Sequence, residues 1–149
     1  MKPYPNSIRE QLLQALILKL VPLAKDMGAR IFRSPVVAVL REQTPAILVF
    51  PVEETTAAQN TQALRKLTVR IVALAREVDG NNGEIVADQL IVAIHAALMA
   101  SNNLGGLCIK IREIGTEWDI EDADARAVAI PAKYEIDYRT HINDLTLKI

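Results

Sequence analysis

Apolar side chains recur at helical spacing near the start of the chain. Ser7 and Glu10 are typical of a capping box, in which Ser7 accepts from the amide of residue 10 and Glu10 reaches back. The apolar positions of the helix that follows are Ile8, Leu12, Leu13, Leu16, Ile17, Leu20 and Leu23. Pro22 is expected to kink or end this helix, because proline lacks an amide hydrogen and crowds the preceding turn. Gly28 fits a helix stop.

A second helix is predicted over residues 84–101, after the strongest break in the chain at residues 80–83. Its apolar residues cover more than one stripe, and a helix that is apolar nearly all round is buried on more than one side. Lys19 interrupts the first helix and Asp88 the second. Neither therefore supplies the roughly 20 clean apolar residues of a membrane span.

Short extended runs follow the first helix. Residues 29–33, 36–40 and 45–51 are predicted strands, and prolines bracket the last of them. Prolines suit the starts and edges of strands rather than their centres. Residues 53–61 are polar and are predicted to form an exposed loop that can reach a neighbouring subunit.

Residues 64–77 are predicted to form a strand that alternates in its first half. One face carries Leu67, Val69, Ile71, Ala73 and Ala75. Thr68 and Arg70 begin the other face, but Val72 and Leu74 continue it. A strand whose second half is apolar on both faces is covered on both sides or lies at a subunit boundary.

Two strands are predicted near the C-terminus, over residues 107–114 and 128–142, as an antiparallel pair with a long connection. In the second, one face carries Val128, Ile130, Tyr134, Ile136, Tyr138 and Ile142. The order of elements predicts an α+β fold. It would be a single domain over residues 1–149, with a mixed or mostly antiparallel sheet and two main helices packed on it.

Composition narrows the function classes. The 149 residues favour one domain, and 17 Lys and Arg against 18 Asp and Glu give a net charge of −1. This balance argues against a dedicated nucleic-acid or membrane-surface binder, because both need excess positive charge on one face. Cys108 is the single cysteine, which excludes an intramolecular disulfide. The first residues lack a signal-peptide pattern, so a soluble cytoplasmic protein is expected.

No catalytic, metal or cofactor site is predicted. His95 lies seven positions after Asp88, and such a pair can exchange protons, but a packed or interface histidine is the favoured interpretation. Cys108 alternates with apolar neighbours in a strand and is interpreted as a small core or surface residue. Residues 80–83 lack a phosphate-binding pattern and indicate a turn followed by a helix N-cap.

Half of the residues are hydrophobic, which together with the missing site chemistry indicates a subunit that packs on other chains. The acidic stretch before the last strand contains Glu117, Asp119, Glu121, Asp122 and Asp124. It can be interpreted as a divalent-cation site, a solvated loop, or a protruding hairpin in which Trp118 anchors a neighbouring subunit. Arg70, Glu53 and Glu54 complete the candidate interface.

Segments from nearly the whole chain carry a family likeness. They are residues 8–13, the proline-bracketed strand 45–51, the strand 65–75, residues 88–98 leading to 104–107, and the corner at 116–118 ahead of the strand that ends at 138–140. Together they resemble the tail terminator proteins of tailed bacteriophages, the group that includes the minor tail protein U family.

This resemblance implies an α+β subunit that assembles as a hexameric ring. Such a ring caps the tail tube, ends its polymerisation and joins it to the head connector, without cofactor or catalysis. The resemblance also implies a phage or prophage origin, synthesis in the bacterial host cytoplasm and a final place in the virion tail. Partners would be further copies of the chain and the tail-tube and head-connector proteins, with no membrane and no specific nucleic acid. Related folds serve as tube and head–tail joining proteins, so those roles stay open.

Two other hypotheses remain. The first is a small dimeric α+β domain that binds a ligand or regulates, with an apolar pocket near His95 and no catalysis. The second is a small hydrolase or transferase, which would need His95 or His141 brought beside Cys108 or a carboxylate.

Overall fold

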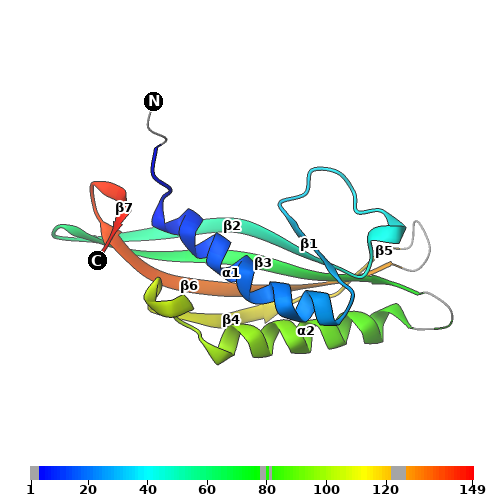
Figure 1. The fold of residues 1–149 in the computed structure, drawn as a ribbon. Coiled ribbons are helices and arrows are strands. Elements are labelled where there is room, and N and C mark those ends of the chain that lie inside the picture. The colour runs from blue at the N-terminus through cyan, green and yellow to red at the C-terminus, as the bar shows by residue number, and fades with distance from the viewer. Residues whose placement is uncertain (1–3, 78–79, 81, 122–126) are drawn as a thin grey trace.

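The computed structural model describes residues 4–77, 80, 82–121 and 127–149. The helices are α1 (Ile8–Asp26) and α2 (Gly83–Ala100), with short 3-10 turns η1 (Arg41–Gln43) and η2 (Leu104–Gly106). The strands are β1 (Arg30–Arg33), β2 (Ala46–Gln59), β3 (Gln62–Arg76), β4 (Lys110–Thr116), β5 (Asp119–Glu121), β6 (Ala127–His141) and β7 (Asp144–Lys148). The strands form one curled sheet beside the two helices, which confirms the predicted α+β class (Figure 1).

The sheet is mixed, with the strand order β1-β2-β3-β6-β4. β2 and β3 form a long hairpin, β6 runs antiparallel to β3, and β4 runs antiparallel to β6, as predicted for the last two long strands. β1 is parallel to β2, and the short strands β5 and β7 both pair with β6. The sequence did not predict β5 or β7 as strands. They are three and five residues long, too short to show a clear alternation.

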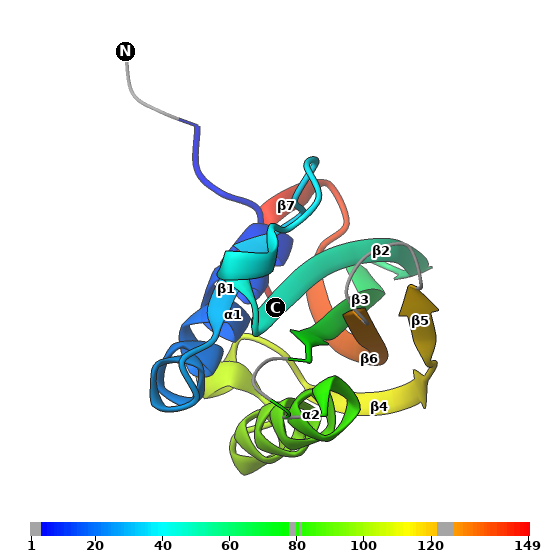
Figure 2. The ribbon, with the colours of Figure 1, turned by 90° about the vertical axis from the view of Figure 1, so that its right-hand side faces the viewer.

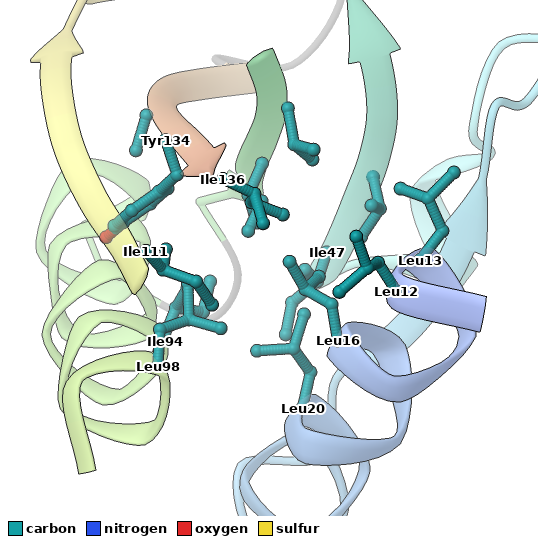
Figure 3. Close-up of a cluster of buried hydrophobic side chains, with 14 of the residues drawn as sticks. Leu12, Leu13, Leu16, Leu20, Ile47, Ile94, Leu98, Ile111, Tyr134 and Ile136 are labelled. Atoms are coloured by element: carbon teal, nitrogen blue, oxygen red, sulfur yellow. The ribbon is translucent and has the colours of Figure 1, made fainter. Parts of the chain in front are cut away.

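Both helices cover the same face of the sheet. α1 lies against β1 and β2, and α2 lies against β3, β6 and β4. Leucines of α1 and apolar residues of α2 meet the predicted inward face of β3 and β6 in one continuous core (Figure 3). Burying each large aliphatic side chain of this core stabilises the fold by about 1.5–3 kcal/mol. The core therefore fixes the positions of the surfaces described below.

The ends of α1 differ in part from the expectation. Ser7 caps the helix by accepting from the amide of Glu10 at 3.1 Å, but the Glu10 carboxylate binds Gln14 and Arg33 instead of reaching back. Pro22 does not end the helix, which continues to Asp26. Pro22 is exposed, so water can take the carbonyl that its missing amide leaves unpaired. The helix stops at Gly28 as predicted, where φ is +65°.

Two predictions for the first half of the sheet are wrong. Residues 53–61 are not a loop, because β2 continues to residue 59 and turns at Asn60, where φ is +56°, into β3. On β2 this part is mostly polar and is exposed except at Glu54, so it does not show the alternation of a half-buried strand, whereas β3 beside it buries Ala63, Arg65 and Leu67. Residues 36–40 form no strand, and Val36 is 98% exposed.

α2 buries a single stripe, which corrects the prediction that it is covered on more than one side. The buried positions are Gly83, Ala87, Leu90, Ile94 and Leu98. Asn82 accepts from the amide of Glu84 at 2.9 Å and caps the helix as predicted, while Asn81 lies outside the described residues. Within the described part of the chain, α2 is the one helix that is long and apolar enough to cross a membrane, by those two criteria alone.

Candidate interaction surfaces

A buried polar cluster joins α1 to three strands around Glu54. The Glu54 carboxylate accepts from Arg9 at 2.7 Å and from the hydroxyl of Tyr138, and Arg65 lies 3.5 Å away. Arg65 also donates to Thr140 at 3.0 Å. Burial and the neighbouring Glu54 carboxylate raise the pKa of Tyr138 above its ordinary value. Glu54, a predicted interface residue, is therefore bound inside the fold of its own chain.

Glu53 lies next to Glu54 but is exposed. The register of the hairpin shifts between Pro51 and Glu53, so that Glu53 pairs with Thr68 and Glu54 pairs with Leu67. A shift of one residue exchanges the two faces of a strand, which turns Glu54 toward the helices and Glu53 away from them. Of this predicted pair, only Glu53 stays accessible to another chain.

Arg70 lies on the second face of the sheet, opposite the helices. Its guanidinium carbon is 5.0 Å from the centroid of the Phe50 ring, a cation–π contact. Residues 35–39 cross this face and enclose a cavity of about 390 Å³ with Phe50, Arg70, Val72 and Leu74. Of the two alternatives predicted for the second half of β3, this segment supports coverage on both sides, and Val72 is buried beneath it. It also leaves Arg70 only partly accessible.

Trp118 is 62% exposed at the corner between β4 and β5. Beside it, Glu117 is exposed and lies 4.0 Å from Lys133, while its amide donates to the carbonyl of Pro131 at 2.9 Å. Asp119 and Glu121 belong to β5 and pair with β6, whereas Asp122 and Asp124 lie outside the described residues. Within the described ranges, no group of three or more His, Cys, Asp or Glu residues is placed to hold a metal ion.

His95 contacts the sheet rather than Asp88. Its Nδ1 lies 2.9 Å from the hydroxyl of Tyr134 and 3.1 Å from the carboxylate of Glu113, while Asp88 is exposed. Burial, followed by the charge of Glu113, raises the pKa of Tyr134 to about 12, so its hydroxyl keeps its proton at neutral pH. A cavity of about 390 Å³ borders this cluster, lined also by Ile91, Val92, Ala96 and Thr116.

Cys108 and His141, the other residues that the enzyme hypothesis names, do not form an activated nucleophile. The buried Cys108 thiol donates to the carbonyl of Asn102 at 3.6 Å. Burial raises the pKa of this thiol to about 11, so it stays protonated at neutral pH. His141 accepts from the amide of Asn143 at 3.2 Å. Neither of these contacts is a nucleophile–base pair, whereas His95 does lie beside a carboxylate, that of Glu113, which is one arrangement that the enzyme hypothesis requires.

Both helices also present exposed apolar side chains, and those of α2 belong to the broad apolar surface that the sequence predicts for this helix. On α1, Leu18 is 70% exposed, with Val21 exposed one turn later. On α2, Val92 is 63% exposed, with Ile85 exposed two turns earlier. The helical spacing of apolar residues predicts the core side of α1, and Leu18 and Val21 lie outside it.

Fold and surfaces together define a class: an α+β fold with a buried polar cluster around Glu54, a half-exposed polar cluster around His95, and exposed apolar helix faces. No protein-family model and no curated protein sequence matches this chain.

Proposed function

We propose that this protein is a structural subunit of a ring, of the kind that terminates phage tails. The ring, a hexamer in this proposal, caps the tail tube, ends its polymerisation and joins it to the head connector. The likeness of segments described above supports the choice of this family. Synthesis in a bacterial host cytoplasm and a place in the virion tail belong to the same proposal.

The observation that carries the proposal is the exposure of large apolar side chains on two different elements. Leu18 and Val21 are exposed on α1, and Ile85 and Val92 on α2. Contiguous apolar patches on a subunit surface mark sites of association. A ring of identical subunits is built by contacts between two different faces of each copy. Two separate apolar faces are what such a subunit needs.

The hairpin of β2 and β3 supports the same proposal. It reaches past the helices at one end of the molecule (Figure 1). Its outer part is polar, with Thr55, Thr56 and Gln59 exposed on β2. On β3 the same part buries Ala63 and Arg65, so its exposed side is the β2 edge. In an assembly it would contact a neighbouring copy or the end of the tail tube.

Solution mass tests the proposal directly. Size exclusion with light scattering, over a range of concentrations, is expected to give six times the mass of the 16.4 kDa chain. Negative-stain images should show rings with a central opening. Rings added to polymerising tail-tube subunits should stop growth at the capped end. A mass of one chain at every concentration would contradict the proposal.

The second candidate is a dimeric ligand-binding or regulatory domain. The cavity bordered by His95, Glu113 and Tyr134 favours it, because it joins an apolar lining to a few polar groups. This candidate predicts a dimer at all concentrations and a small molecule that raises the melting temperature. Ala96→Phe, which places a larger side chain in the cavity, should abolish that stabilisation while the dimer persists.

A further inference from the structure

The outer side of α1 carries one continuous exposed stripe, which we name the α1 stripe. Its members are Gln14, Leu18, Val21, Pro22 and Lys25. They follow one another at steps of three or four residues, with Val21 and Pro22 adjacent, so they lie along one side of the helix. The stripe is apolar in its middle and ends at Lys25, and the exposed Asp26, four residues after Pro22, lies on its flank.

The outer side of α2 carries a matching stripe, which we name the α2 stripe. Its members are Ile85, Asp88, Gln89, Val92 and Ala96, all exposed. The charged residues of α2 are Glu84 and Asp88, and the helix contains no Lys or Arg. The α2 stripe therefore carries one acid, Asp88, and the α1 stripe carries one base, Lys25. Complementary charge of this kind sets partner choice and register across an interface.

With Lys25 set against Asp88, the order of residues favours one docking direction. From Lys25, Val21 lies four residues back along α1 and Leu18 seven back. From Asp88, Val92 lies four residues forward along α2 and Ala96 eight forward. Since both helices rise about 1.5 Å per residue, antiparallel docking places these pairs together. Lys25 then faces Asp88, Val21 faces Val92, and Leu18 faces Ala96. Parallel docking would set Val21 against Glu84 and carry Leu18 past the start of α2.

We propose that the α1 stripe of one copy docks antiparallel on the α2 stripe of the next copy. This inference rests on the proposed ring and names the contact that closes it. Within a subunit α1 and α2 are neighbours, joined where Lys19 donates to the carbonyl of Ala97 at 3.5 Å. Viewed from the end, α1 forms one side of the molecule and α2 another (Figure 2). The two stripes therefore suit a head-to-tail contact, in which each copy uses a different face toward each neighbour.

Charge exchange between two variants tests this contact. Lys25→Glu sets two acids against each other at the interface, and Asp88→Lys sets two bases against each other. Each variant alone should assemble roughly tenfold more weakly, because like charges across an interface are costly. An equimolar mixture of the two should recover the wild-type mass, since each altered residue then meets its opposite charge. This recovery in trans requires that Lys25 and Asp88 face one another in different copies.

Matched controls separate the contact from general effects of charge and folding. Lys110→Glu reverses an exposed charge on β4, outside both stripes, and should leave the mass unchanged. Val92→Glu should abolish assembly, whereas Val36→Asp, which changes a more exposed valine in the loop after β1, should not. Circular dichroism on each variant confirms that the chain is folded before its mass is interpreted.

The outcomes separate the contact from the ring itself. A wild-type ring that the stripe variants leave intact, or a mixture that fails to recover, would overturn the contact and keep the ring. Recovery in trans within a stable dimer would support the contact and overturn the ring. A wild-type monomer at every concentration would overturn both. If Val92→Glu instead removes only binding to phosphatidylcholine vesicles, α2 faces lipid and the contact is wrong.

Discussion

Two tyrosines four residues apart on β6 anchor two polar clusters with opposite characters. Tyr138 donates to Glu54, which two arginines also approach, and the Glu54 side chain is only 11% exposed. Tyr134 meets His95 and Glu113, and the Glu113 side chain is 47% exposed. Both tyrosines are themselves buried. The first cluster is closed and ties α1 to the sheet, while the second opens onto a cavity. Two tyrosines on the same face of one strand therefore have different roles. Tyr138 helps to hold the fold together, whereas Tyr134 belongs to an accessible surface.

Replacing the carboxylate of each cluster by alanine should give the largest difference in stability between the two clusters. Glu54→Ala leaves Arg65 and Tyr138 buried without their partner, which should lower the free energy of unfolding by about 3 kcal/mol. Glu113→Ala, the matched change, should lower it by no more than about 0.5 kcal/mol, because water replaces an exposed partner. Urea unfolding of both variants measures the difference. Equal losses would show that the two clusters do not differ.

Removing the two hydroxyls gives a smaller contrast. Tyr138→Phe deletes a hydrogen bond to a charged acceptor and should cost about 1.5 kcal/mol of unfolding free energy. Tyr134→Phe should cost about 0.5 kcal/mol, since its partner His95 is half exposed and can bond to water. The same urea experiment applies. A larger loss for Tyr134→Phe would reverse the assignment of the closed cluster.

The comparison also shows what the sequence can and cannot predict. Alternation along β6 places Tyr134 and Tyr138 on the core face, and the structure confirms it. Alternation fails for Glu54, because the irregularity between Pro51 and Glu53 exchanges the faces of β2. No local signal marks that shift in a polar segment. The closed cluster can therefore be predicted only when the pairing of β2 with β3 is known.

The second cluster fails to emerge from the sequence for a different reason. His95 has a carboxylate at helical spacing, Asp88, and local reasoning can offer only that partner. The actual partner, Glu113, is placed by the register of β4 against β6, in which Glu113 pairs with Tyr134. Long-range pairing of this kind depends on the whole sheet. Helix positions and core faces follow from local pattern, whereas contacts between elements do not.

Alkaline pH should destabilise the fold through both tyrosines. The folded state raises the pKa of Tyr134 from 10.0 to about 12, so it holds this proton more tightly than the unfolded chain. The resulting stability is complete below pH 10 and is lost as the pH rises toward 12. The pKa of Tyr138 is raised in the same direction, so its contribution is also lost above its ordinary pKa. Unfolding free energy measured across this window should fall less steeply in Tyr134→Phe and in Tyr138→Phe. A slope unchanged in both variants would contradict the assignment.

The smallest change in the free energy of unfolding is expected for a substitution of His95. It tests the difference between the two clusters at the accessible one. Glutamine keeps a polar group near Tyr134 and Glu113, and the site is open enough for water to complete the remaining hydrogen bonds. His95→Gln should therefore change the free energy of unfolding by no more than about 0.5 kcal/mol. Thermal and urea unfolding measure this change, and the solution mass should stay that of the wild type, because His95 lies outside both stripes. A loss close to that of Glu54→Ala would mean that the His95 cluster holds the fold together as the Glu54 cluster does. The His95 cluster would then stabilise the fold, and the cavity beside it would no longer be supported as a binding site.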